Sequence, residues 1–198
     1  MEIDPAVTRT AQAHFGLQDA EATIYHQDGR QYFLEKETEY DIVIMDAFGS
    51  SSIPFHLVTE ESFALIKEHL SAGGVLAMNV QSVGWRDQIV LSLAATAQRQ
   101  FRHVIALPIA EPPDQLGNMI LLASDRPLTL ASDLPLPDYR VSPEYNRAHA
   151  WDQQFVVDTA GVLVLTDELN PVDVWSENVN LVSRRKLHEF LGQRRVAW

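Results

Sequence analysis

DIVIMD, residues 41–46, is a short run of apolar, largely β-branched residues with an aspartate at each end. It is too short for a helix of its own, and its nearly continuous apolar character is typical of a buried strand in a parallel sheet. In open α/β sheets, ligands bind beyond the carboxyl ends of the strands. We therefore predict a buried parallel strand here, with Asp46 at the edge where a ligand would bind.

The segments that follow this strand alternate between helical and extended patterns. Thr59, with Glu60 and Glu61 after it, predicts a capped helix start, and Gly73 with Gly74 predicts its end. Further strands are expected at residues 75–80, 103–109 and 118–124, and a further helix at residues 85–100. This alternation predicts an α/β fold, a mostly parallel sheet with helices on both faces.

The segments that precede the strand are less regular. Asp4 and Pro5 predict a helix start, because a carboxylate caps free backbone amides and proline fits the first helical turn. Gly16 is the expected end of this helix. Residues 22–26 form another short apolar run.

The chain changes character after residue 125. Prolines between residues 127 and 143 predict a connector that crosses the surface. Residues 155–171 hold two apolar runs around Gly161, which indicate a hairpin or a strand broken by a turn, and residues 181–193 predict a final helix. We expect residues 126–198 to pack on the same domain as residues 1–125.

Composition excludes several classes of chemistry. The 198 residues, 46% of them apolar, suffice for one domain with a hydrophobic core. Without cysteine, the chain has no disulfide, thiolate metal site or cysteine nucleophile. A formal charge of −12 opposes binding to nucleic acid. An acidic surface favours a cationic substrate such as a polyamine, or serves solubility alone.

Targeting signals are not evident in the sequence. No apolar run is long enough for a membrane-spanning helix, and the first residues do not combine a basic stretch with an apolar one. We therefore expect a cytoplasmic protein with no membrane segment in this chain.

Acidic residues stand at several expected ligand-binding positions, and each has two interpretations. Glu2 is either a ligand-binding residue or a disordered terminal one, and Asp4 is better explained as a helix cap. Asp28, beside Gly29, is either a ligand-binding or a turn residue. Asp46 is either catalytic or the cap of a loop, since an acid at the end of an apolar strand must be solvated or hydrogen-bonded.

Other polar residues give weaker signals. His56 and His69 lack a second histidine at metal-ligand spacing, so we interpret both as structural or exposed and expect no metal site. The serines at residues 50–52 lack the flanking glycines of a nucleophile elbow, which argues against hydrolase chemistry. Residues 79–85 also follow an expected strand and are the last candidate ligand-binding segment.

Three stretches in succession resemble one enzyme family. They are EIDPAV at residues 2–7, HQDGRQYFL at residues 26–34, and YDIVIMDAFGSSSIPFHLVTEESFALIKEHLSAGGVLAMNV at residues 40–80. Their order and separations are similar to those of the spermidine synthase family, and LTDELNPVDVW at residues 165–175 is similar to a C-terminal segment of bacterial members.

The resemblance implies a methyltransferase-like Rossmann fold for residues 1–125. It implies binding of decarboxylated S-adenosylmethionine, or of S-adenosylmethionine itself, as a co-substrate, and transfer of an aminopropyl group to putrescine or a related amine. By position, Glu2 would bind the ribose, Asp28 and Gly29 would meet the adenine, and Asp46 would be the catalytic carboxylate.

An acid suits this chemistry. An alkylamine with a pKa of about 10 is protonated at neutral pH and cannot attack carbon until it loses a proton. A carboxylate orients the amine and accepts that proton. The leaving group is a sulfonium that becomes a neutral thioether, so the reaction needs neither a general acid nor a metal.

The sequence departs from the family at two places. The family pattern D-x-x-D has its second acid three residues after the catalytic one, where this chain has Gly49. The family's glycine-rich first strand, about twenty residues ahead of EIDP, has no counterpart. We therefore expect the first strand of the sheet to be missing, so that either another segment fills the gap or the chain is a fragment of a longer gene product. For the first case we expect a homodimer, with residues 155–167 as a candidate substitute strand.

Two other functions stay open on the sequence alone. One is a small-molecule methyltransferase of the same fold that uses S-adenosylmethionine. The other is a noncatalytic module that keeps the fold for assembly or regulation, which the glycine at position 49 and the missing strand favour.

Overall fold

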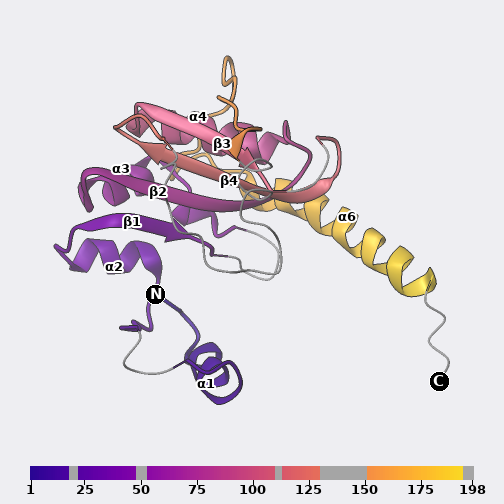
Figure 1. Cartoon of the computed structure of the whole chain (residues 1–198), viewed down its shortest axis with the longest axis horizontal. Helices are drawn as coiled ribbons and strands as arrows, with labels where there is room; N and C mark the ends of the chain where they lie inside the picture. Colours follow the sequence, from indigo (N-terminus) through magenta and orange to yellow (C-terminus); the bar gives the residue numbers. More distant parts are fainter. Residues whose placement is uncertain (18–21, 48–52, 110–112, 130–150, 194–198) are drawn as a thin grey trace.

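The computed structural model describes residues 1–17, 22–47, 53–109, 113–129 and 151–193. Ten helices and strands lie in these ranges (Figure 1), in this order: α1 (Pro5–His14), α2 (Gly29–Glu35), β1 (Tyr40–Met45), the 3-10 helix η1 (Phe55–Leu57), α3 (Glu60–Glu68), β2 (Leu70–Val83), α4 (Gln88–Gln100), β3 (His103–Pro108), β4 (Leu116–Ser124) and α6 (Val172–Gln193).

The strands form one sheet in the order β1-β2-β4-β3. β1 pairs parallel to β2, with Val43 opposite Leu76, whereas β4 runs antiparallel to both β2 and β3. We expected a mostly parallel sheet, yet only the first of these three pairings is parallel. The reason lies in the link between β3 and β4, residues 109–115, which is too short for the crossover that parallel neighbours need.

One face of the sheet is buried. The registers place Leu76, Met78 and Val80 of β2 on this face beside Leu121 and Ala123 of β4, and all five side chains are buried. They form one core with residues of α3, α4 and α6, which therefore cover this face together. The core includes Phe63, Ile66, Leu93, Ala97, Val172 and Val179.

The opposite face is more open. Ile42 and Ile44 of β1 point to it, and these residues are 59% and 73% exposed. Ala77 and Ile120, farther into the sheet, are half-buried. We expected helices on both faces, but in the described ranges the buried core gathers α3, α4 and α6 on one face alone.

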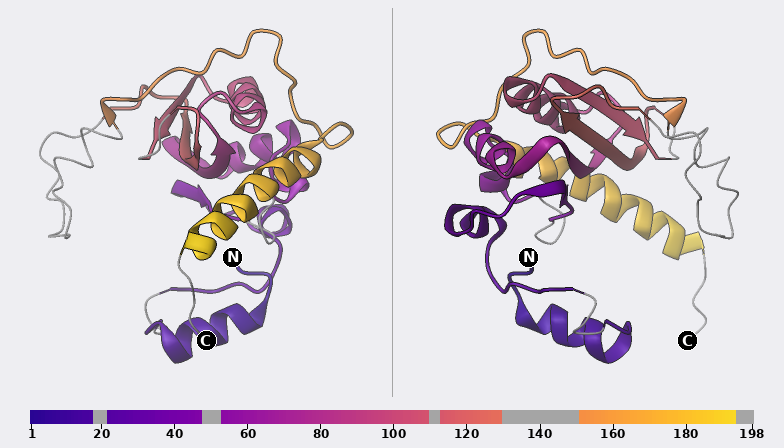
Figure 2. Two further views of the ribbon diagram at one scale, coloured as in Figure 1. Left: turned by 90° about the vertical axis from the view of Figure 1, so that its right-hand side faces the viewer. Right: turned by 60° about the vertical axis from the view of Figure 1, so that its left-hand side comes forward.

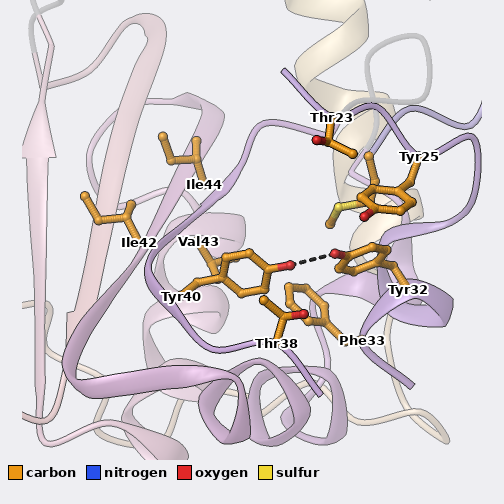
Figure 3. A pocket seen from close by; sticks show the side chains of 10 residues that line it. Thr23, Tyr25, Tyr32, Phe33, Thr38, Tyr40, Ile42, Val43 and Ile44 are labelled. Carbon is orange, nitrogen blue, oxygen red and sulfur yellow. Dashed lines mark hydrogen bonds between the residues drawn. The ribbon is translucent and has the colours of Figure 1, made fainter. Parts of the chain in front are cut away.

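The outer edge of β1 faces a cavity instead of a neighbouring strand in the described structure. The cavity, about 460 Å³, separates β1 from residues 1–3 and 22–27, which are joined by a bond from Glu2 N to Tyr25 O. Figure 3 shows Thr23 and Tyr25 across this space from Ile42 and Ile44. Residues 22–27 contain no strand, so β1 is an edge strand of the sheet that the described residues form.

A tyrosine pair forms the floor of this cavity. The hydroxyl groups of Tyr32 and Tyr40 lie 2.6 Å apart (Figure 3). The hydrogen bond to Tyr40, together with burial, raises the pKa of Tyr32 above its ordinary value, so the phenol stays protonated. α2 is thereby attached to β1 beside the open edge.

Helix starts follow their capping residues. Asp4 caps α1 by accepting a bond from Ala6 N, and Thr59 caps α3 by accepting one from Ser62 N, as the sequence predicted. α4 was expected to begin at Trp85, but it begins at Gln88 because Asp87 is its cap. α1 lies apart from the sheet (Figures 1 and 2).

The C-terminal segment differs from its expected form. Residues 155–171 were interpreted as a hairpin or a broken strand, but their one β-bridge joins Phe155 to Ala106, and Gly161 turns the chain with a φ of 71°. Side chains replace a strand ladder here: Thr96 Oγ1 accepts a bond of 2.9 Å from Leu165 N. This segment runs along β3 and α4, so the prediction that it substitutes for the first strand is wrong.

α6 is longer than the sequence predicted. It begins at Val172, directly after Pro171, and its first turns are buried against the sheet and α4. Its later turns extend beyond the sheet (Figures 1 and 2), where Leu187 and Leu191 are exposed.

Candidate functional site

A second cavity of about 460 Å³ opens where β1 ends and α2 begins. Its lining includes all four residues that the sequence analysis singled out, namely Glu2, Asp28, Gly29 and Asp46. They come together because the carboxyl end of β1 and the chain before α2 meet at the same edge of the fold. Asp4, interpreted above as a helix cap, does not line it.

Asp46 is positioned by its neighbour on β2. Asn79 Nδ2 donates a hydrogen bond of 2.9 Å to Asp46 Oδ1. The other amide atom, Asn79 Oδ1, is buried and meets no donor within the described residues. A buried acceptor without a donor is unfavourable, so this oxygen is suited to accept from a bound ligand.

A smaller cavity lies on the other side of Asp46. It measures about 340 Å³, and its lining includes Asp46, Asn79, Ile44 and Ile120 from the open face of the sheet. Asp46 thus lines both cavities, the larger one beside α2, where charged side chains stand among apolar ones, and the smaller one on the open face of the sheet. A carboxylate in this position is able to contact two different molecules at once.

Glu2 is held by its backbone and by a local bond. Its N–H donates to Tyr25 O at 3.0 Å, and its Oε1 accepts from Asp4 N at 2.9 Å. These bonds fix the residue at the cavity wall, so the interpretation of Glu2 as a disordered terminal residue is wrong.

Asp28 is the N-cap of α2, a short helix that the sequence analysis did not predict. Its Oδ1 accepts bonds from Arg30 N at 2.9 Å and Gln31 N at 3.1 Å. Its Oδ2 lies 2.7 Å from His56 Nε2. Burial raises the pKa of Asp28, but the bonds from His56 and the backbone outweigh it, and the pKa falls below its ordinary value. Asp28 is therefore an anion that fixes α2 and His56.

His56 is a site residue that the sequence analysis missed. Its interpretation as structural or exposed agrees with its bond to Asp28, but nothing in the local sequence indicated that it also lines the larger cavity. No local pattern joins residues 28 positions apart. For Asp28 there was a signal, since Gln31 follows at the spacing of a helix cap.

Arg30 connects the cavity wall to the C-terminal segment. Its guanidinium donates two parallel bonds to Asp167, at 2.7 and 2.6 Å, and a third of 3.2 Å to His56 O. The bonds with Asp167 raise the pKa of Arg30, and the same bonds lower the pKa of Asp167. Both groups are therefore charged over a wide pH range, and the pair is stable as an ion pair.

Two candidates of the sequence analysis cannot be placed. Gly49, which replaces the family's second acid, and the serines at residues 50–52 lie outside the described residues.

Comparison with known proteins identifies the family. The family model described as the spermine/spermidine synthase domain matches residues 2–130. The chain belongs to the spermine/spermidine synthase family. This match confirms the resemblance carried by the stretches at residues 2–7, 26–34 and 40–80. It covers every cavity residue named in this subsection, whereas Asp167, the partner of Arg30, lies beyond it.

Similar proteins support the same assignment. A polyamine aminopropyltransferase of Vibrio vulnificus is 32% identical over 127 residues, which cover 62% of this chain and 40% of that protein. The crystal structure of a probable spermidine synthase from Corynebacterium glutamicum aligns with a TM-score of 0.57 at 26% identity, over 68% of this chain and 49% of that one. The chain thus spans less than half the length of these two family members.

Two more distant structures show the fold alone. Human methyltransferase-like protein 13, in complex with SAH, aligns with a TM-score of 0.53 at 23% identity, over 66% of this chain and 62% of that one. A spermidine synthase in complex with the transition-state analogue AdoDATO aligns with a TM-score of 0.51 at 20% identity, over 63% and 43%. They confirm the α/β, methyltransferase-like class.

In the described part of the chain, no helix has the length and apolar character needed to cross a bilayer.

Proposed function

We propose that this member of the spermine/spermidine synthase family takes part in aminopropyl transfer from decarboxylated S-adenosylmethionine to a polyamine such as putrescine. The observation that carries the proposal is the single cavity that Glu2, Asp28, Gly29 and Asp46 line together. Complexes of fold neighbours with SAH and AdoDATO support a nucleoside of the S-adenosylmethionine type. We also propose that the protein is located in the cytoplasm.

The two cavities beside Asp46 suit the two substrates. The nucleoside would lie in the larger cavity, with Glu2 toward its ribose and Asp28 with Gly29 toward its adenine. The amine would approach Asp46 from the smaller cavity, whose apolar wall matches a methylene chain. Asn79 holds Asp46 by its amide nitrogen and offers its buried oxygen to the ammonium.

The chemical step needs one proton acceptor. Asp46 accepts a proton from the ammonium, the freed nitrogen pair attacks the methylene next to sulfur, and a carbon–nitrogen bond forms. The carbon–sulfur bond breaks, its electron pair stays on sulfur, and the neutral thioether methylthioadenosine leaves. With the nucleoside in the larger cavity and the amine in the smaller one, Asp46 would lie beside both reactants, and this proximity would supply much of the rate enhancement.

The purified chain tests this proposal directly. With decarboxylated S-adenosylmethionine and putrescine we expect methylthioadenosine and spermidine in equal amounts, measured by mass spectrometry against a reaction without protein. Spermidine formation at the rate of the protein-free control, with no nucleoside binding by calorimetry, would contradict the proposal and favour the noncatalytic alternative.

The second candidate function is methyl transfer from S-adenosylmethionine. The methyltransferase-like neighbour favours it at the level of fold. The same assay separates the two, because methyl transfer releases S-adenosylhomocysteine and aminopropyl transfer releases methylthioadenosine.

We also propose that the chain is a homodimer joined at β1. The open face of the sheet at β1, where Ile42 and Ile44 are exposed, offers an apolar surface for a second copy. We expect an interface above about 1,000 Å². Light scattering at micromolar concentration checks this, with Ile44→Lys expected to shift the mass toward that of a monomer. A monomeric mass for the unchanged chain would refute the dimer.

A further inference from the structure

The cavity proposed for the nucleoside has a cationic side chain in its wall. Arg30 lines it together with the acids Glu2, Asp28 and Asp46. In the proposed reaction both substrates carry positive charge, the nucleoside on its sulfonium and the amine on its ammonium. An unpaired guanidinium at this place would repel both of them.

The C-terminal segment removes this obstacle. The carboxylate of Asp167 accepts bonds from both terminal nitrogens of Arg30 and balances the charge of the guanidinium. The Arg30 side chain is 22% exposed, so solvent alone does not screen the charge fully.

Asp167 is itself held in place by the fold. Its backbone N–H donates to Glu61 Oε2 at 3.0 Å, and two residues earlier the carbonyl of Leu165 accepts from Glu60 N at 2.8 Å. Asn170 Nδ2 donates to Phe55 O at 2.8 Å, next to His56. The segment is thus bonded to the helix and loop that form the cavity wall, and Asp167 arrives at Arg30 in a fixed geometry.

We propose that Asp167 is a specificity-determining residue that masks the charge of Arg30, so that the cavity prefers cationic sulfonium nucleosides to neutral thioether nucleosides. This inference rests on the proposed function. It assigns a role to a residue outside the 2–130 range of the family model.

The test compares two nucleosides that differ in charge. Decarboxylated S-adenosylmethionine is a cation and methylthioadenosine has a neutral thioether, and calorimetry gives both dissociation constants. Asp167→Asn keeps the shape of the side chain but removes the carboxylate that is paired with Arg30, which leaves only the more distant charges of Asp28 and Glu61 to offset the guanidinium. We expect a roughly fivefold to tenfold weaker affinity for the cation, and an affinity for methylthioadenosine within about twofold.

Arg30→Gln is the matched control, because it removes the positive charge of the pair where Asp167→Asn removes the negative one. It removes the positive charge and leaves Asp167, so affinity for the cation should stay equal or increase. In the double variant Arg30→Gln/Asp167→Asn, affinity for the cation should return to that of the unchanged protein. A purely structural role would instead weaken the binding of both nucleosides in all three variants, and that result would overturn the inference.

The remaining outcomes are distinct. Methylthioadenosine binding by the unchanged protein, with equal cation affinity in Asp167→Asn, would overturn the inference and leave the proposed function intact. Absence of binding of both nucleosides to the unchanged protein would overturn the proposed function and the inference together. If Asp167→Asn does not fold, Arg30→Gln still decides, because weaker binding of the cation there contradicts charge masking.

Discussion

Asp46→Asn is expected to reduce aminopropyl transfer by about 10²- to 10⁴-fold while leaving the affinity for methylthioadenosine within about twofold. The substitution keeps the shape of the side chain and the oxygen that accepts from Asn79 Nδ2, so the cavity wall should persist. It removes the group that accepts the proton of the amine. Turnover and product binding, measured on the same preparation, separate these effects.

Asp41→Asn is the control for this variant. Asp41 lies at the opposite end of β1, where its carboxylate accepts a bond of 2.7 Å from Ser71 Oγ. It is far along the strand from the cavity, so its amide variant should retain turnover. Equal turnover in Asp46→Asn and the unchanged protein would remove Asp46 from the mechanism.

Leu165→Ala is expected to lower the free energy of unfolding by about 2–5 kcal/mol. Leu165 is fully buried in the core although it belongs to a segment without regular secondary structure. Removing its side chain leaves a cavity next to Thr96, whose hydroxyl accepts from the Leu165 N–H. Urea denaturation followed by circular dichroism measures the change.

Leu169→Ala provides the comparison. Leu169 lies four residues later and is 55% exposed, so its substitution should change the free energy of unfolding by about 0.5 kcal/mol at most. If Leu165→Ala changed the free energy of unfolding as little as Leu169→Ala does, the C-terminal segment would not unfold together with the sheet.

Local sequence patterns predicted those helices and strands that are determined by residues close together in the sequence. The apolar run at residues 41–46 forms β1, which is parallel to β2 as predicted, and Asp4 and Thr59 cap the helices that they were expected to cap. The prediction that this strand is buried is wrong, because β1 lies at the edge of the sheet and exposes Ile42 and Ile44. The candidate site also followed from such patterns, because residues after strand ends share one edge of an α/β sheet. Hence Glu2, Asp28, Gly29 and Asp46 were found before the structure placed them around one cavity.

The contacts that local patterns missed are distant in sequence. Arg30 and Asp167 are 137 residues apart, and His56 and Asp28 are 28 apart, so their pairing depends on the assembled fold. Residues 155–171 contain the β-branched residues of a strand, but side chains of α4 bond their backbone in place of a strand ladder. The antiparallel β4 likewise follows from a short link, which periodicity does not reveal.

The outer edge of β1 also affects how this chain behaves at high concentration. Exposed edge strands in soluble proteins usually carry lysine, proline or a protective bulge that discourages pairing with other chains. β1 presents Ile42 and Ile44 and contains neither lysine nor proline, and its one register irregularity lies at its start, between Tyr40 and Ile42. Its edge is thus a template for any extended apolar segment, including one from a partly unfolded copy, and aggregation would begin at this strand unless a partner covers it.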